Sequence, residues 1–106
     1  MSSRATPAEP SRVLATVFCP HCVQRVEAHV LFRYGAPGSF QLGDIVRGSN
    51  APRVVADASV QGPCPACEWE GAWPVEVWLE RDRLISVNPP SRRFNWVQAG
   101  DYIALE

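Results

Sequence analysis

The chain has 106 residues, a formal net charge of −1 at neutral pH and ten basic residues, all of which are arginine. The lack of lysine excludes a catalytic Schiff-base lysine, and the near-neutral charge disfavours binding to nucleic acid through its backbone phosphates, which needs clustered cations. This length predicts a single domain that buries somewhat over ~60% of its unfolded surface.

The N-terminal twelve residues are polar and contain Pro7 and Pro10. They predict a disordered lead-in at residues 1–12, followed by a single zinc-ribbon-like domain over residues 13–106. The apolar run at 13–18 is typical of a strand and is too short for a signal peptide or a membrane span. We therefore expect a cytoplasmic protein without a membrane partner.

Two C-x2-C frames, at residues 19–22 (CPHC) and 64–67 (CPAC), contain every cysteine of the chain. Such a pair of knuckles, separated by a long loop, is typical of a tetrahedral zinc site, because each short turn directs two thiolates to one point. A closed four-thiolate site has no open coordination position, so it stabilises a fold and does not itself catalyse. Iron in a four-thiolate site is the alternative. The predicted ligands of one structural Zn2+ are Cys19, Cys22, Cys64 and Cys67.

Between the two knuckles the sequence predicts three strands. Residues 26–34 alternate apolar and charged side chains with a period of two, which favours a half-buried strand, although the same stretch also fits one face of a helix. Two glycines and a proline at 35–38 predict a turn, and residues 39–46 a return strand that completes a hairpin. A third strand is predicted at 54–60.

After the second knuckle, residues 73–79 place Trp73 and aliphatic side chains on one face and Trp78 with glutamates on the other. We expect Trp73 in the core. A polar turn at 80–83 and a strand at 84–87 would complete a second hairpin.

The C-terminal segment, residues 91–106, has β-prone stretches at 96–97 and 102–105. Ten prolines and seven glycines along the chain argue against long helices. The predicted fold class is therefore mostly β, with antiparallel hairpins that form a small zinc-ribbon-like sheet and with little helix. Four aspartates are predicted to have structural roles at turns: Asp44, Asp57, Asp82 and Asp101.

The two CPxC knuckles beside predicted hairpins resemble the zinc-ribbon group, from Phe18 to about Val87. In that group a glycine usually follows the second cysteine of each knuckle, where the backbone often needs a positive φ; Val23 and Glu68 stand at these positions here. Residues 40–45 (FQLGDI) are also similar to a segment of small uncharacterised zinc-ribbon proteins of bacteria and phages. The resemblance implies a zinc-stabilised sheet and no particular activity.

The CPHC frame is also similar to the active site of thiol–disulfide oxidoreductases, where a helix after the motif activates the first thiol. Only 18 residues precede the motif, which leaves little room for the expected β-α-β unit, and the second knuckle has no role in this interpretation. Redox catalysis centred on Cys19 is therefore an alternative hypothesis. We expect His21 to donate to a sulfur or to face solvent, and Trp69 to shield the metal.

Aromatic and basic residues outside the knuckles are candidate partner contacts. An exposed Trp78 would be an anchor for a protein, unless a second layer such as the C-terminal segment covers its face. Residues 92–96 (RRFNW) combine cations with aromatic rings, as in single-stranded nucleic acid binding, but in one short stretch. The candidate contact residues are Trp78, Arg92, Arg93, Phe94 and Trp96.

The sequence contains no Ser/His/Asp set, no phosphate-binding glycine loop and no paired-carboxylate spacing. We therefore expect a non-enzymatic, zinc-stabilised binding or accessory module whose partner is a protein. A nucleic-acid-binding zinc ribbon and a thiol–disulfide oxidoreductase are the alternatives. The sequence predicts no oligomeric state.

Overall fold

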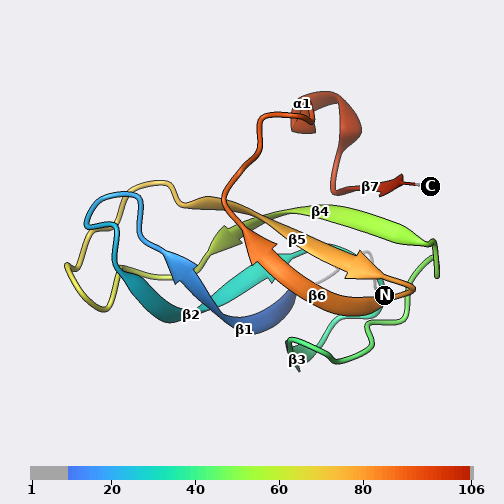
Figure 1. The fold of residues 1–106 in the computed structure, drawn as a ribbon, viewed down its shortest axis with the longest axis horizontal. Coiled ribbons are helices and arrows are strands. Elements are labelled where there is room, and N and C mark those ends of the chain that lie inside the picture. The colour runs from blue at the N-terminus through green and yellow to red at the C-terminus, as the bar shows by residue number, and fades with distance from the viewer. Residues whose placement is uncertain (1–9, 106) are drawn as a thin grey trace, which may run out of the picture.

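The computed structural model describes residues 10–105, which form seven strands and one short helix (Figure 1). This confirms the mostly β prediction. No helix in the described range is long and apolar enough to cross a membrane. The elements in chain order are β1 (Ser11–Phe18), β2 (Arg25–Phe32), β3 (Ser39–Gln41), β4 (Arg53–Val60), β5 (Pro74–Glu80), β6 (Arg83–Asn88), α1 (Trp96–Ala99) and β7 (Tyr102–Leu105).

The predicted lead-in at residues 1–12 overlaps the first strand. Residues 1–9 lie outside the described residues, but Ser11 and Arg12 already belong to β1. The side chain of Ser11 is buried and its hydroxyl donates to the carbonyl of Ala36 at 3.3 Å, while the N–H of Arg12 donates to Gly38 at 2.9 Å. These polar residues fit a strand because the loop after β2 supplies their partners.

All strands belong to one curled sheet with the order β3-β1-β2-β4-β5-β6. Strand β4 lies at its centre and pairs with β5 along one edge. Along its other edge it pairs first with β7, at residues 53–56, and then with β2, at residues 58–60. The curl brings residues 43–46 beside the start of β6, where Leu84 exchanges backbone hydrogen bonds of 2.8 and 2.9 Å with Gly43 and Asp44. The sheet therefore closes on itself at the end opposite the cysteine loops (Figure 1).

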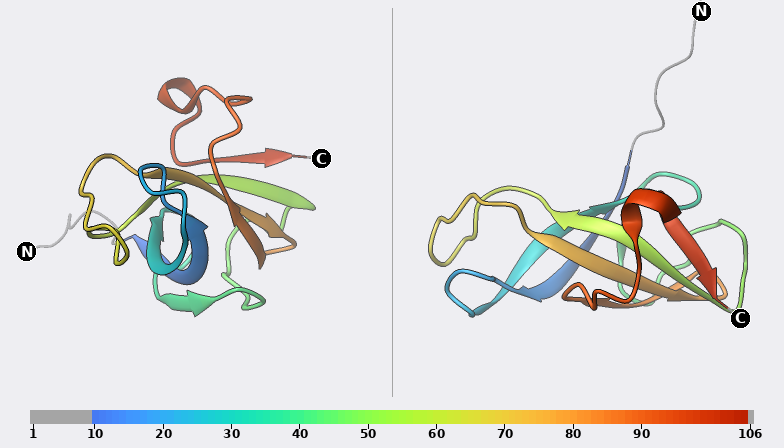
Figure 2. Two further views of the ribbon diagram at one scale, coloured as in Figure 1. Left: turned by 60° about the vertical axis from the view of Figure 1, so that its left-hand side comes forward. Right: turned by 90° about the horizontal axis from the view of Figure 1, so that it is seen from above.

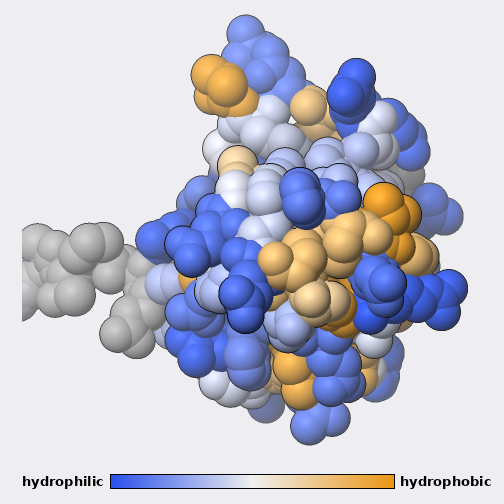
Figure 3. All heavy atoms as spheres, turned by 90° about the vertical axis from the view of Figure 1, so that its left-hand side faces the viewer, coloured by the Kyte–Doolittle hydropathy of each residue, from blue (hydrophilic) through white to orange (hydrophobic). Residues whose placement is uncertain are grey.

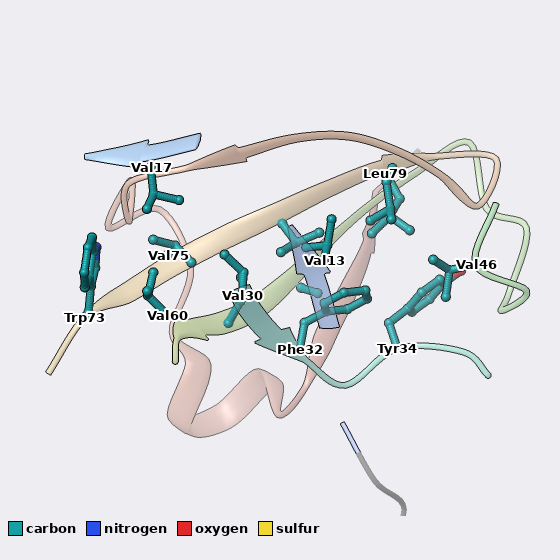
Figure 4. Close-up of a cluster of buried hydrophobic side chains, with 14 of the residues drawn as sticks. Val13, Val17, Val30, Phe32, Tyr34, Val46, Val60, Trp73, Val75 and Leu79 are labelled. Atoms are coloured by element: carbon teal, nitrogen blue, oxygen red, sulfur yellow. The ribbon is translucent and has the colours of Figure 1, made fainter. Parts of the chain in front are cut away.

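The hydrophobic core lies inside this curl. Alternate residues of β1 point inward, as the buried Val13 and Val17 show, and the neighbouring strands add their inward faces. Figure 4 shows Trp73 at one end of the cluster and Tyr34 with Val46 at the other. Each fully buried aliphatic or aromatic side chain stabilises the fold by about 1.5–3 kcal/mol. The prediction that Trp73 belongs to the core is confirmed.

The second predicted hairpin is confirmed and the first is wrong. Strands β5 and β6 are joined by Arg81 and Asp82, which both have positive φ (46° and 66°), as a two-residue type I′ turn requires. The predicted return strand at 39–46 is reduced to β3, which pairs in parallel with β1 and not with β2. Its ladder stops because Asp44 makes a local turn, in which its carboxylate accepts from the N–H of Gln41 at 2.8 Å.

Three smaller expectations are also corrected. The helical alternative for residues 26–34 is wrong, because β2 occupies 25–32 and pairs along its length with β1. Residues 96–97 begin the helix α1 rather than a strand, although β7 follows as predicted. Asp57 lies within β4 and not at a turn.

The C-terminal segment covers the outer face of β5. It is therefore the second layer that the sequence analysis raised as an alternative to an exposed Trp78. The contacts come from residues 91–96, before and at the start of α1, whereas β7 pairs with β4; Figures 1 and 2 show α1 raised above the sheet. Glu76 is 1% exposed and accepts hydrogen bonds of 3.3 Å from the N–H and hydroxyl of Ser91. Trp78 is half-buried, with its ring centroid 6.2 Å from that of Phe94.

Candidate metal centre

The two cysteine knuckles lie side by side at one end of the molecule, in the β1–β2 and β4–β5 loops (Figure 1). Their four Sγ atoms lie within 4.8 Å of one another. Cys19 Sγ is 3.8 Å from Cys67 Sγ, and Cys22 Sγ is 3.9 Å from Cys64 Sγ. A tetrahedral ion with metal–sulfur bonds of about 2.3 Å has sulfur–sulfur edges of about 3.8 Å. The structure thus brings together all four predicted ligands in a geometry suited to one metal ion.

The two knuckles have the same backbone hydrogen bonds. In the first, the N–H of Cys19 donates to Gln24 at 3.0 Å and its carbonyl accepts from Val23 at 2.8 Å. The second repeats both bonds around Cys64, at 2.9 and 2.7 Å. Since each knuckle turn is closed by its own backbone hydrogen bonds, each pair of thiols is positioned by its own turn.

Backbone N–H groups point at the first sulfur of each knuckle. Cys19 Sγ accepts from the N–H of His21 at 3.3 Å and of Cys22 at 3.4 Å, and Cys64 Sγ accepts from Ala66 at 3.3 Å. Burial raises the pKa of the Cys19 thiol, but these donors and the neighbouring thiols lower it by more, to about 7. Such donors stabilise the thiolate, which is the form that binds metal.

The partly exposed thiols are harder to ionise without a cation. The backbone N–H of Trp69 lowers the pKa of Cys67, but burial and the three nearby thiols raise it by more, to about 12. The pKa of Cys22 is also raised: the Gln24 backbone lowers it, but burial and Cys19 outweigh that effect. Four thiolates at these distances repel one another, so a cation is needed to hold them together.

Two aromatic residues cover the solvent side of the cysteines. His21 Nδ1 lies 3.6 Å from Cys67 Sγ, and its ring stacks on Trp69 with centroids 6.0 Å apart. Trp69 also contacts Trp73, at 6.2 Å between centroids. His21 thus contacts a sulfur and lies outside the four-thiol set, and Trp69 lies beside the site as the sequence predicted.

The candidate partner contacts form a separate group, on the outer face of β5. Trp78, Phe94 and Trp96 make a row of rings with centroid distances of 6.2 and 5.7 Å, here called the aromatic row. The guanidinium of Arg93 lies 5.5 Å from the centre of the Phe94 ring, and Arg92 is exposed with a φ of 65°. The structure therefore brings these residues together, apart from the cysteines in the fold.

Sequence reasoning missed a buried polar cluster at the end opposite the cysteines. The carboxylate of Asp82 accepts hydrogen bonds from the hydroxyl of Tyr34 and from the N–H groups of Gly48 (2.8 Å) and Asn50 (3.0 Å). This cluster ties the loop before β4 to the β5–β6 turn. The sequence predicted a polar turn at 80–83 and a structural role for Asp82 there, but it gave no sign of the partners in the loop before β4.

No protein-family profile, curated protein or solved structure matches this chain. Its function must therefore be argued from its own residues. The oxidoreductase interpretation expects a helix after the CPHC frame, but this position holds β2. The four thiols face one another across the two knuckles, which is an arrangement for holding an ion.

Proposed function

We propose that this protein is a non-enzymatic binding module of zinc-ribbon type, held together by one structural Zn2+ on its four cysteines. The observation that carries the proposal is the sulfur geometry, with 3.8 and 3.9 Å between thiols of opposite knuckles. Thiolate ligands in tetrahedral geometry are typical of zinc. Four thiolates fill the coordination of such an ion and leave no position for a substrate.

The partner that fits the surface best is a protein. Four thiolates and one Zn2+ change the formal charge from −1 to about −3, which disfavours a polyanion. Large apolar side chains are exposed, among them Phe18 (48%), Val23 (71%) and Val97 (96%). The aromatic row, with Arg92 and Arg93, is a further candidate contact. Zinc–thiolate sites need reduced cysteines, so we place the protein in the cytoplasm.

The experiment is affinity capture from a cell lysate with the tagged, zinc-loaded chain. The control is a Cys64→Ser variant, which lacks one of the four proposed zinc ligands. The proposal expects a protein that is retained by the wild type alone and that binds the purified chain directly and saturably. Binding to single-stranded nucleic acid that weakens steeply with salt would favour the nucleic-acid alternative instead. Turnover of a disulfide substrate by Cys19 would favour the oxidoreductase.

A further inference from the structure

A cleft of about 620 Å³ opens between the end of β1 and the end of β6, next to the cysteines. Its walls include three aromatic rings, from Phe18, Trp69 and Trp73, and the prolines that end β6. Thr16 and Asn88 supply the polar side chains, and no described residue of the lining is charged. Figure 3 shows apolar residues gathered at this end of the molecule. The cleft therefore suits an uncharged, apolar group of a size typical of ligand sites.

The cleft depends on both cysteine knuckles. Cys19 and Val23 come from the first, and Trp69 and Trp73 come from the loop of the second. Trp73 also donates its indole N–H to the carbonyl of Phe18 at 3.2 Å, which joins the two walls. Since a metal ion would tie one knuckle to the other, its removal would separate the walls of the cleft.

One wall of the cleft is an unpaired strand edge. On the side of β1 that faces β3, pairing ends at Leu14, and within residues 10–105 no strand continues it. The N–H of Arg12 points to this side, where it donates to Gly38. Peptide groups alternate along a strand, so the N–H and carbonyl of Thr16 point to the same side. An exposed edge of this kind is a template for another strand.

The charge at the rim indicates which kind of segment fits. The guanidinium of Arg25 lies 5.3 Å from the centre of the Phe18 ring, at the knuckle end of this edge. In the described part of the chain Arg25 forms no ion pair, so its charge is free to meet an acidic residue. A small apolar molecule would use neither this cation nor the free peptide groups of Thr16.

We infer that the cleft binds an extended segment of a partner protein, which adds as a strand to the edge of β1. Alternate apolar side chains of the segment enter the cleft, and an acidic residue at its end meets Arg25. Main-chain hydrogen bonds to Thr16 supply affinity and the cleft supplies specificity. This inference rests on the proposed function, since it names the partner's chemistry and requires the metal-tied knuckles.

The test begins with a phage-displayed library of random linear peptides, selected on the zinc-loaded protein and counter-selected on the chelated protein. We expect enrichment of sequences with apolar residues at alternate positions and an acidic flank. The affinity of a labelled peptide of the enriched sequence is then measured by fluorescence polarisation. Failure to enrich any peptide on the zinc-loaded form would overturn the inference.

Two variants of one residue separate strand addition from simple filling of the cleft. Thr16→Pro removes the N–H at the free edge, where proline is tolerated, and leaves the pairing of β1 with β2 intact. Thr16→Val removes the hydroxyl and keeps the N–H. We expect at least about a tenfold loss of peptide affinity for T16P and little change for T16V. Equal affinity of the two variants would overturn strand addition.

Hydrogen exchange provides a test that does not require the T16P variant to fold. In the wild type, the amide of Thr16 should exchange at least about tenfold more slowly when the peptide is bound. An unchanged exchange rate with peptide bound would contradict the inference.

Photo-crosslinking distinguishes a failure of this inference from a failure of the proposed function. We would replace either Phe18, in the cleft, or Phe94, in the aromatic row, with p-benzoylphenylalanine and add the captured partner. Crosslinking from position 18 is expected. Crosslinking from position 94 alone would leave the binding-module proposal standing and overturn the cleft as its site.

Discussion

Val23 and Glu68 occupy equivalent positions in the two knuckles, directly after the second cysteine, and both have left-handed backbone conformations, with φ of 60° and 64°. This is the position at which zinc-ribbon knuckles usually have glycine, and the backbone here adopts the positive φ that glycine would permit. A left-handed conformation costs a non-glycine residue about 1–2 kcal/mol, and a β-branched side chain is rare there. The N–H of each residue donates to the carbonyl of the first cysteine of its knuckle, at 2.8 Å for Val23 and 2.7 Å for Glu68.

Val23→Gly should therefore stabilise the metal-bound protein, because Val23 is 71% exposed and its removal sacrifices little buried surface. The gain is reduced by the greater freedom of glycine in the unfolded chain, so we expect a net increase of about 1 kcal/mol in the free energy of unfolding. Denaturant unfolding with saturating zinc measures it. As a control, Val97→Gly, at an exposed helical position, should lower stability slightly. Lower stability in V23G would show that the valine is not strained.

Asp82→Asn tests the buried polar cluster at the other end of the fold. The carboxylate of Asp82 accepts three hydrogen bonds, and asparagine keeps the left-handed turn while it removes the charge. We expect a loss of about 2–3 kcal/mol at pH 7, by thermal or chemical unfolding. Tyr34→Phe removes the hydroxyl that donates to Asp82 and accepts from the N–H of Ser49 at 2.7 Å, but it leaves the carboxylate; it is the matched control and should cost less.

The pH dependence of this difference follows from the pKa of Asp82. Burial raises that pKa, but Tyr34 and the N–H groups of Gly48 and Asn50 lower it by more, to below its ordinary value. The stabilisation is therefore fully present above the pKa of an unfolded aspartate, about 3.9, and is lost as pH falls through the lower folded value. The wild type and D82N should differ by the same amount from pH 8 to pH 5. A difference that shrinks within this range would contradict the assignment.

Gly71→Ala tests whether Trp69 is held in place beside the four cysteines and the cleft. A Cβ at Gly71 would lie 2.1 Å from the Trp69 ring, so the ring must leave the position in which it stacks on His21. We expect a loss of about 1–3 kcal/mol, altered tryptophan fluorescence and faster release of metal to a chelator. Gly38→Ala, whose Cβ would lie 3.1 Å from the Phe40 ring, is the control and should leave metal release unchanged. Unchanged fluorescence and metal release in G71A would show that the position of Trp69 does not shield the cysteine site from a chelator.

The clustering of the four cysteines could be predicted from the sequence, because the C-x2-C spacing itself sets the local geometry. A C-x2-C turn directs two thiols to one point whatever the surrounding fold, so the four cysteines needed no knowledge of the sheet. Period-two alternation likewise located β2 and β5, since each has one face in the core.

The rest of the fold depends on partners that are distant in the sequence. Residues 39–46 have the composition of a strand, but the curl of the sheet divides them between β1 and β6, and local periodicity contains no sign of this. Trp78 lies in a polar pattern, yet Phe94 packs on it because the C-terminal segment returns over β5. The cleft is formed by three segments, so no single stretch of sequence predicts it.

The central claim is that four cysteines hold one metal ion on which the fold depends. Native mass spectrometry with elemental analysis, on protein purified without added metal or chelator, tests it most directly. We predict one zinc ion per chain, with loss of the fold when the ion is chelated. A folded, metal-free chain in which Cys19 reacts readily with an alkylating reagent would contradict the account and favour redox chemistry at the CPHC frame.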